Sequence, residues 1–381
     1  MGRHRKRRAS PRLSRRIALL SAGLLIPGTG GAAVLAATAH LDEHAVPSAR
    51  SHSAASRPGA AMTEIPGTRS RTTTARPTSA AAPATAAPDT TASAAPAAAI
   101  PFAPYADVLT WPPLDFAKTS ARTGVRDYTL GFVAAGDGCT ATWGGMTPIN
   151  DPVIRKRIKK VPGETIVSFG GPHATELARS CTDVAALSER YRSALTTAGT
   201  EQIDFYLTDA ALGDGTSAGR RIQALARLRH DHPRLRVSFT LPLHRSGLAG
   251  AALATLRSAM AAGVDVSIVD LLPAGGPGPT LIASAAAAHG QLQRLYRQDA
   301  DTVWRRMGIT PVIGVTDTGA GFQSADARQI RDWADARHLG RLSMWSITRD
   351  TPCTPDTTAR NDTCSGLDED AGVFSRIFQG S

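Results

Sequence analysis

Two apolar runs separated by a helical pattern decide the fold of this chain. The first run reads TIVSFGG at residues 165–171, and the second reads QIDFYL at residues 202–207. Residues 182–197, which lie between them, have the length and apolar spacing of a helix. Short β-branched and aromatic runs that alternate with helices indicate parallel strands joined by helical crossovers.

The same alternation continues from residue 104 to the C-terminal end. We predict eight strands, at residues 106–110, 128–133, 165–169, 202–207, 236–240, 264–271, 310–315 and 341–347. We predict helices at residues 154–160, 182–197, 219–230, 249–262, 279–307 and 324–339. Eight such units close as a barrel, so the predicted fold class is α/β, a (β/α)8 TIM barrel. An open doubly wound sheet is disfavoured because no Gly-rich dinucleotide fingerprint follows the first strand.

The composition changes abruptly near residue 100. All five Trp, all five Tyr and all nine Phe lie beyond it, so residues 101–381 hold the whole aromatic core. That length is typical of one TIM barrel. Of the net charge of +11, residues 1–100 carry +9 and the remainder +2. The nearly neutral domain therefore gives no reason to expect nucleic acid as a partner.

Residues 1–41 have the features of an export signal. A block at residues 3–16 holds eight basic residues and no acidic one, and an apolar run at 17–26 follows it. SRRI at residues 14–17 is a weak match to a twin-arginine signal. Residues 17–41 are also long enough to span a bilayer as an uncleaved anchor. We therefore expect a barrel that is secreted, or anchored outside the cell with its N-terminal segment at the membrane.

Residues 42–100 are of low complexity, with repeated Ala-Pro, Thr-Thr and Ser-Ala pairs. Such a segment cannot bury enough apolar surface to offset the loss of chain entropy on folding. We predict a disordered, semi-extended linker here, which precedes a barrel at residues 101–381.

Four cysteines lie in the predicted barrel, and an even number in an exported protein indicates disulfides. Four cysteines allow three connectivities. Cys353 and Cys364 are close in sequence and bracket a polar loop, so we pair them and leave Cys139–Cys181 as the second bond. Free thiols or a metal site are the alternative, but there is no Cys-x-x-Cys motif and no nearby pair of histidines. We predict no metal and no cofactor.

A TIM barrel builds its active site at the C-terminal ends of the strands. At these ends the chain carries LGFV at 130–133, VSFGG at 167–171, VSFTLP at 237–242 and LSMWS at 342–346. With these motifs, in order over residues 101–378, it resembles the chitinases of glycoside hydrolase family 18 found in Streptomyces-like actinobacteria. The resemblance implies chitin or another N-acetylglucosamine glycan as the partner. It implies a sugar site with Trp345 as its floor and with Gly170 and Gly171 among its substrate-binding residues.

The resemblance breaks at the fourth strand. The family motif D-x-x-D-x-D-x-E falls on residues 201–208, where Asp204 is kept, Tyr206 replaces an Asp and Thr208 replaces the Glu. In the family that Glu protonates the leaving oxygen, and the Asp supports the substrate's acetamido group as it attacks the anomeric carbon. A threonine hydroxyl holds its proton too tightly to act as a general acid near neutral pH. Losing a general acid costs about 10² to 10⁴ in rate.

The sixth strand departs from the family in the same way. The family's Asp and Tyr that hold the acetamido group fall on Gly275 and Gly276. Asp209 and Asp214 are the alternative acids. Asp209 directly follows Thr208, and strand alternation directs it to the opposite face unless the chain bulges.

Two functions fit this pattern, and the sequence leaves open whether the chain is an enzyme. We favour an exported, non-hydrolytic barrel that binds an N-acetylglucosamine glycan through Trp345, Trp111 and Tyr206, or acts as an extracellular scaffold. The alternative is an active chitinase or endo-N-acetylglucosaminidase that uses relocated acidic residues. We interpret Asp204 as a buried structural carboxylate. The loop residues His173 and His244 are interpreted as solvated histidines.

Overall fold

The structure is a computed structural model that describes residues 99–316, 319, 321–355 and 362–380. These residues belong to one compact unit, Asp89–Ser381. The predicted export signal and nearly all of the predicted linker lie outside the described residues. Within the described part of the chain, no helix is both long and apolar enough to cross a membrane.

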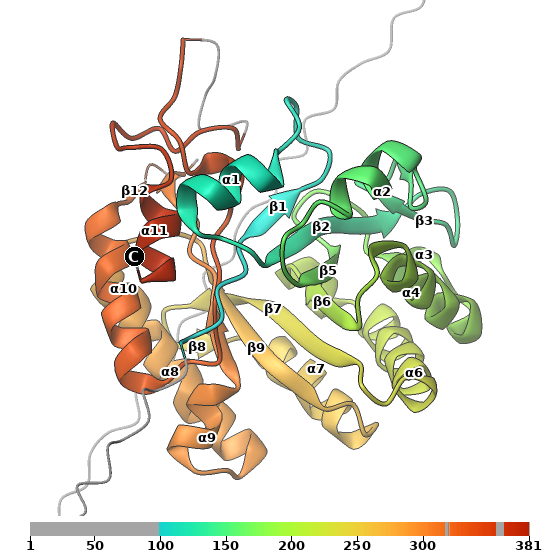
Figure 1. The fold of residues 1–381 in the computed structure, drawn as a ribbon. Helices are drawn as coiled ribbons and strands as arrows, with labels where there is room; N and C mark the ends of the chain where they lie inside the picture. Colours follow the sequence, from blue (N-terminus) through green and yellow to red (C-terminus); the bar gives the residue numbers. More distant parts are fainter. Residues whose placement is uncertain (1–98, 317–318, 320, 356–361, 381) are drawn as a thin grey trace, which may run out of the picture. The chain divides into compact units, whose positions relative to one another are not determined.

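Eight parallel strands of the described residues close into a barrel (Figure 1). In chain order they are β1 (Tyr105–Asp107), β2 (Tyr128–Ala135), β5 (Thr165–Gly170), β6 (Gln202–Tyr206), β7 (Arg236–His244), β9 (Val266–Pro273), β10 (Met307–Ile309) and β13 (Arg341–Leu342). Each strand pairs with the next. The ring closes where Leu342 N donates to Pro101 O at 2.8 Å and Ala103 N donates to Leu342 O at 3.0 Å. The predicted (β/α)8 barrel is confirmed.

Helices cover the outside of the barrel (Figure 1). They are α1 (Phe116–Thr123), α2 (Pro152–Ile158), α3 (Leu177–Ser180), α4 (Val184–Ala198), α5 (Asp209–Gly213), α6 (Gly215–Asp231), α7 (Gly250–Ala261), α8 (Gly278–Tyr296), α9 (Ala300–Arg305), α10 (Ser324–Arg337) and α11 (Val373–Gln379), with a 3₁₀ turn η1 (Ile347–Arg349). Short strands extend the loops: β3 (Ala141–Trp143), β4 (Thr147–Pro148), β8 (Gly247–Leu248), β11 (Gly314–Val315) and β12 (Gly321–Phe322). Many helices begin where a side-chain oxygen caps the first turn, as at Asp115, Asp151, Asp183, Asp214 and Asp299.

Some predicted boundaries were wrong. The predicted helix at residues 279–307 is two helices, because α8 ends at Arg297 in the left-handed conformation and Asp299 caps α9. The seventh strand was predicted at residues 310–315, but β10 is Met307–Ile309, whose side chains are fully buried. The first and last strands are also shorter than predicted, since β1 ends at Asp107 and η1 replaces the end of the eighth strand.

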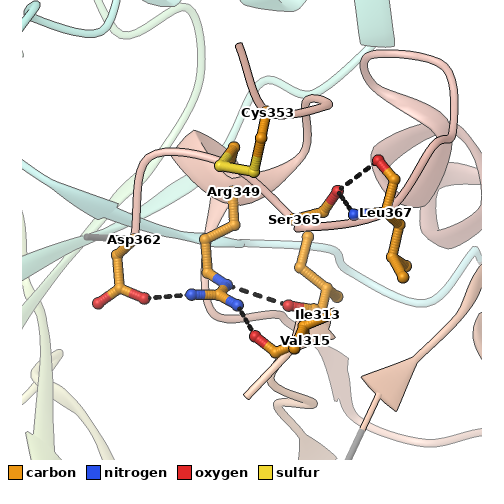
Figure 2. Close-up of a disulfide and its surroundings, with 8 residues drawn as sticks. Ile313, Val315, Arg349, Cys353, Asp362, Ser365 and Leu367 are labelled. Carbon is orange, nitrogen blue, oxygen red and sulfur yellow. Dashed lines mark hydrogen bonds and ion pairs between the residues drawn. A yellow bond between two sulfur atoms is a disulfide. The ribbon is translucent and has the colours of Figure 1, made fainter. Parts of the chain in front are cut away.

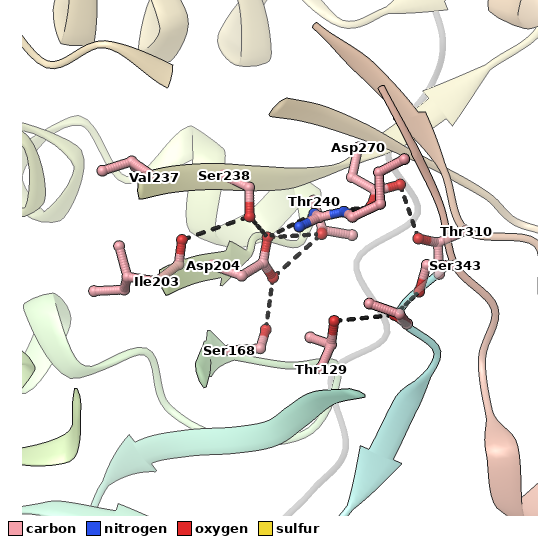
Figure 3. Close-up of polar contacts among 12 residues, drawn as sticks. Thr129, Ser168, Ile203, Asp204, Val237, Ser238, Thr240, Asp270, Thr310 and Ser343 are labelled. Carbon is pink, nitrogen blue, oxygen red and sulfur yellow. Dashed lines mark hydrogen bonds and ion pairs between the residues drawn. The ribbon is translucent and has the colours of Figure 1, made fainter. Parts of the chain in front are cut away.

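Strand alternation separates two kinds of side chain. Phe169, Phe205 and Phe239 face the helices, and neighbouring rings of this row have centroids 5.5 and 5.6 Å apart. The residues just before them on β5, β6 and β7 face the barrel interior, where they form hydrogen bonds with one another (Figure 3). The apolar core therefore lies between the barrel and its helices, and a polar layer fills the barrel.

Candidate functional site

Asp204 lies at the centre of this polar layer and is fully buried. Its carboxylate accepts hydrogen bonds of 2.7 to 3.1 Å from the hydroxyls of Ser168, Ser238 and Thr240 (Figure 3). The Tyr105 hydroxyl donates to it as well, at 2.8 Å. Arg341 Nη2 lies 3.6 Å from its Oδ1. A carboxylate so fully engaged holds strands together, as a buried charge must be paired and hydrogen-bonded. This geometry supports the structural interpretation of Asp204.

A second buried carboxylate, Asp270 on β9, completes the layer. Arg341 Nη2 lies 2.9 Å from its Oδ2, and Thr310 Oγ1 donates to its Oδ1 at 2.8 Å. Burial raises the pKa of Asp270, and the Arg341 guanidinium opposes that rise. Two carboxylates and one guanidinium thus form a connected network beneath the C-terminal ends of the strands.

Four aromatic rings meet at these strand ends, and we call Tyr105, Phe132, Tyr206 and Trp345 the aromatic cluster. The Phe132 and Trp345 rings stack with centroids 5.3 Å apart, and Tyr206 meets Phe132 edge-on at 5.1 Å. The Trp345 centroid lies 5.7 Å from that of Tyr105. Tyr105 is buried, whereas the other three are half-buried and keep part of their surface exposed. The structure therefore brings the predicted residues Trp345 and Tyr206 into one cluster.

Trp111 is not placed in the same way. It is 81% exposed in the loop after β1, outside the aromatic contacts that join the cluster. If it serves a ligand, it does so from the rim.

Gly170 and Gly171 shape the cluster by leaving space for it. A Cβ at Gly171 would lie 2.6 Å from the Phe132 ring, and one at Gly170 would lie 2.4 Å from Tyr206 O. Both residues have φ near +95°, a conformation that glycine adopts readily and other residues rarely do. The two predicted glycines therefore let Phe132 and the end of β6 approach the backbone of β5.

At the two positions where the sequence resemblance predicts catalytic carboxylates, the chain has Tyr206 and Thr208. Thr208 Oγ1 accepts a hydrogen bond from Ala211 N at 3.2 Å and caps α5. Burial raises the pKa of Tyr206 to about 12, so its phenol is neutral near neutral pH. Neither side chain can deliver a proton as a carboxylic acid does.

The two alternative acids are engaged elsewhere. Asp209 is exposed, with its Oδ1 3.3 Å from His244 Nε2. Asp214 caps α6, and Ser217 donates to it from the backbone at 3.1 Å and from its hydroxyl at 2.7 Å. Asp209 therefore contacts a surface histidine, and Asp214 serves as a helix cap.

A cavity of about 250 Å³ lies beside Thr208, between the β5–α3 loop and α5. Its wall includes Gly170, Gly171, Tyr206 and Thr208. His173, which we interpreted from the sequence as a solvated loop histidine, also lines this cavity. Two carboxylates, Glu176 and Asp214, also line it. Glu176 is only 6% exposed and forms an ion pair at 3.1 Å with the fully buried Arg221.

Sequence reasoning missed two further carboxylates, Asp107 and Asp362. Asp107 ends β1 two residues after Tyr105, so alternation puts both on the inner face, and this pattern was visible in the sequence. Burial raises the pKa of Asp107, and the charge of Asp362 raises it further. No local sequence pattern marks Asp362 as a site residue, because tertiary contacts after the last strand place it near the barrel mouth.

Both predicted disulfides are confirmed. Cys139 bonds to Cys181, and Cys353 bonds to Cys364 (Figure 2). The first joins the β2–β3 turn to the end of α3, and the second closes the loop that carries Asp362. Within the described ranges, no group of three or more His, Cys, Asp or Glu side chains is placed to hold a metal ion.

Comparisons with known proteins agree with this geometry, although no family model matches the chain. The chain is 28% identical over 277 residues to the probable bifunctional chitinase/lysozyme of Escherichia coli K12, covering 66% of this chain and 31% of that protein. It is 27% identical over 285 residues to Endochitinase 11 of Metarhizium anisopliae, covering 69% and 54%. The chain thus spans between about a third and about half of the length of these relatives.

Solved structures give a similar result at the level of the fold. The catalytic domain of a hyperthermophilic chitinase from Pyrococcus furiosus superposes with a TM-score of 0.66 and 27% identity, over 73% of this chain and 94% of that one. Catalytic-site mutants of its active domain 2 complexed with chito-oligosaccharides match with the same values.

Proposed function

We propose that this chain, a chitinase-like protein of glycoside hydrolase family 18, binds an N-acetylglucosamine glycan without hydrolysing it. One observation carries the proposal: the aromatic cluster is intact, while Tyr206 and Thr208 occupy the positions of the catalytic carboxylates. The chito-oligosaccharides bound to the Pyrococcus furiosus mutants support a carbohydrate ligand for a barrel of this type.

The chemistry of the cluster suits binding better than catalysis. Half-buried aromatic rings offer apolar faces on which the C–H surface of a sugar ring can stack, and such contact needs no proton transfer. Hydrolysis needs a proton donor at the leaving oxygen. Thr208 cannot supply one, and its hydroxyl caps α5.

We also propose that the barrel works outside the cell. Two disulfides in a domain of this kind suit an oxidising compartment, and the basic and apolar blocks at residues 3–26 suit export. The glycan would then belong to a cell wall or to extracellular material.

Titration of the full-length protein with tetra-N-acetylchitotetraose and with peptidoglycan fragments tests the binding proposal. We expect a saturable change in tryptophan fluorescence. We also expect Trp345→Ala to weaken binding about 30-fold, the usual effect of losing an aromatic residue at the centre of an interface. Trp333→Ala, on α10, is the matched control and should bind as the wild type does. Unchanged fluorescence with every glycan would remove the proposal.

The alternative is an active chitinase with relocated acids. The cavity beside Thr208 is what favours it, because Glu176 and Asp214 place carboxylates on its wall. Release of reducing ends from chitin by the wild type, abolished in Asp209→Ala or Asp204→Ala while circular dichroism shows a folded protein, would establish hydrolysis. Hydrolysis lost in Glu176→Gln or Asp214→Asn would point to the cavity instead.

A further inference from the structure

Asp362 is fastened to the strand end that carries Trp345. Ser346, next to Trp345, shares a 2.8 Å hydrogen bond with Thr348, whose hydroxyl donates to Asp362 O at 3.0 Å. Two residues beyond Asp362, the Cys353–Cys364 disulfide closes the loop. The loop therefore cannot place Asp362 far from the aromatic cluster.

Arg349 fixes the Asp362 side chain. Arg349 Nη1 donates to Asp362 Oδ1 at 2.5 Å, and the same guanidinium donates to Ile313 O at 3.0 Å and Val315 O at 2.6 Å (Figure 2). The Arg349 side chain is 4% exposed, whereas that of Asp362 is 42% exposed. Arg349 thus lies beneath the surface and shares its charge among several acceptors, while the carboxylate stays open to a ligand.

The charge of Asp362 acts on two groups at the mouth of the barrel. Beyond the effect of burial, the charge of Asp362 helps to raise the pKa of Tyr206. The same charge, after burial, helps to raise the pKa of Asp107. Asp362, whose backbone Thr348 fastens beside the Trp345 strand end, therefore lies close enough to the ends of β6 and β1 for its charge to act on both.

The groups that would favour an acetamide are absent from the same place. By the sequence resemblance, Tyr206 takes the place of an Asp, and the Asp and Tyr that would hold the acetamido group fall on Gly275 and Gly276. What the mouth offers instead is the carboxylates of Asp107 and Asp362 and the partly exposed rings of Trp345 and Phe132. Carboxylates and aromatic faces both attract an ammonium group.

We propose that Asp362, together with Asp107, makes this site select glucosamine units, which carry a free ammonium group, over their N-acetylated form. The inference rests on the proposed glycan binding and names the class of sugar that the site prefers. A partly de-N-acetylated chitin chain is then the natural ligand, with the ammonium group at Asp362 and a sugar face on Trp345.

Calorimetric titration of the full-length protein with a glucosamine tetramer and with tetra-N-acetylchitotetraose, at mildly acidic pH, tests this preference. We expect the glucosamine tetramer to bind about tenfold more tightly, as is typical for one partly exposed charge pair added to an aromatic contact. Asp362→Asn should weaken its binding about tenfold and leave the acetylated tetramer unaffected. Asp107→Asn is the second variant and should have a smaller effect in the same direction, because burial raises the pKa of Asp107 and favours its neutral form in acid. Asp231→Asn, which changes an exposed residue at the end of α6, is the control.

The results separate the two proposals. Equal binding of both tetramers, tighter binding of the acetylated one, or an equal effect of Asp362→Asn on both would overturn the preference and leave glycan binding intact. Binding of neither tetramer would remove glycan binding, and the preference with it. An equal loss in the Asp231→Asn control would show that the glucosamine tetramer binds through general surface charge, which also overturns the proposal.

Discussion

The interior of the barrel and its mouth use the same strand for different purposes. In the interior, Asp204 is fully buried and four hydroxyls donate to its carboxylate. Two residues further along β6, Tyr206 is half-buried and meets the aromatic cluster. Of the three positions that the resemblance to the chitinases singles out on this strand, the innermost holds a carboxylate that supports the barrel, and the outer two, Tyr206 and Thr208, hold no carboxylate.

The largest effect expected from this contrast is on stability. Asp204→Asn replaces one acceptor oxygen by a donor, so buried hydroxyls lose their partner and Arg341 loses a nearby charge. We expect the free energy of unfolding to fall by roughly 3 to 5 kcal/mol, as when one member of a buried polar network is removed. Urea denaturation followed by circular dichroism measures it, with Asp231→Asn as the control. A variant as stable as the wild type would mean that Asp204 is not structural.

A smaller effect, on stability and on ligand affinity, is expected from opening the disulfide near the barrel mouth. Replacing Cys353 and Cys364 by Ser opens a loop of 11 residues, against 42 for Cys139 and Cys181. Chain entropy predicts losses of about 3 and about 4 kcal/mol respectively. The first variant, although the more stable, should bind the glucosamine tetramer more weakly, because its Asp362 is less well placed. Binding is measured at a temperature where both variants are folded. A greater loss of affinity for the glucosamine tetramer in the Cys139 and Cys181 variant would contradict this prediction.

The smallest effect concerns pH. Burial raises the pKa of Asp107 in the folded protein, so the stability that its protonated form contributes is present below the unfolded pKa and is lost as the pH rises through the folded pKa. Asp107→Asn cannot ionise but can still accept from Leu109 N, as Asp107 does at 2.8 Å. Its melting temperature should match the wild type in acid and exceed it at neutral pH. A variant less stable than the wild type at neutral pH would contradict this.

The barrel was predictable because its signal is local. Residues 202–207 alternate so that Phe205 faces the helices and Asp204 faces inward, as the pattern required. The errors fell where tertiary contacts decide the outcome. No Gly or Pro near residue 297 marks the left-handed break at Arg297, and β10 is only three residues long.

The site was predictable only in part. Trp345 was found from a motif at the end of the eighth strand, and Tyr206 and Thr208 from one at the end of the fourth. The structure places all three at the barrel mouth or beside it. Asp362 was missed because its position depends on a loop that folds back from the C-terminal region. That return is fixed by a disulfide and by Arg349, which no pattern at residue 362 reveals.

The seam that closes the barrel has a consequence for the order in which the protein can fold. Residues 101–105 pair with residues 342–344, and Ser343 Oγ donates to Ala103 O at 2.8 Å across 240 positions of sequence. During synthesis the outer edge of β1 has no partner until residue 344 has emerged, so this edge stays unpaired while the other strands of the barrel can already pair with their neighbours. A chain cut short before its last forty residues would lose not only its final strand but also the neighbour that its first strand requires.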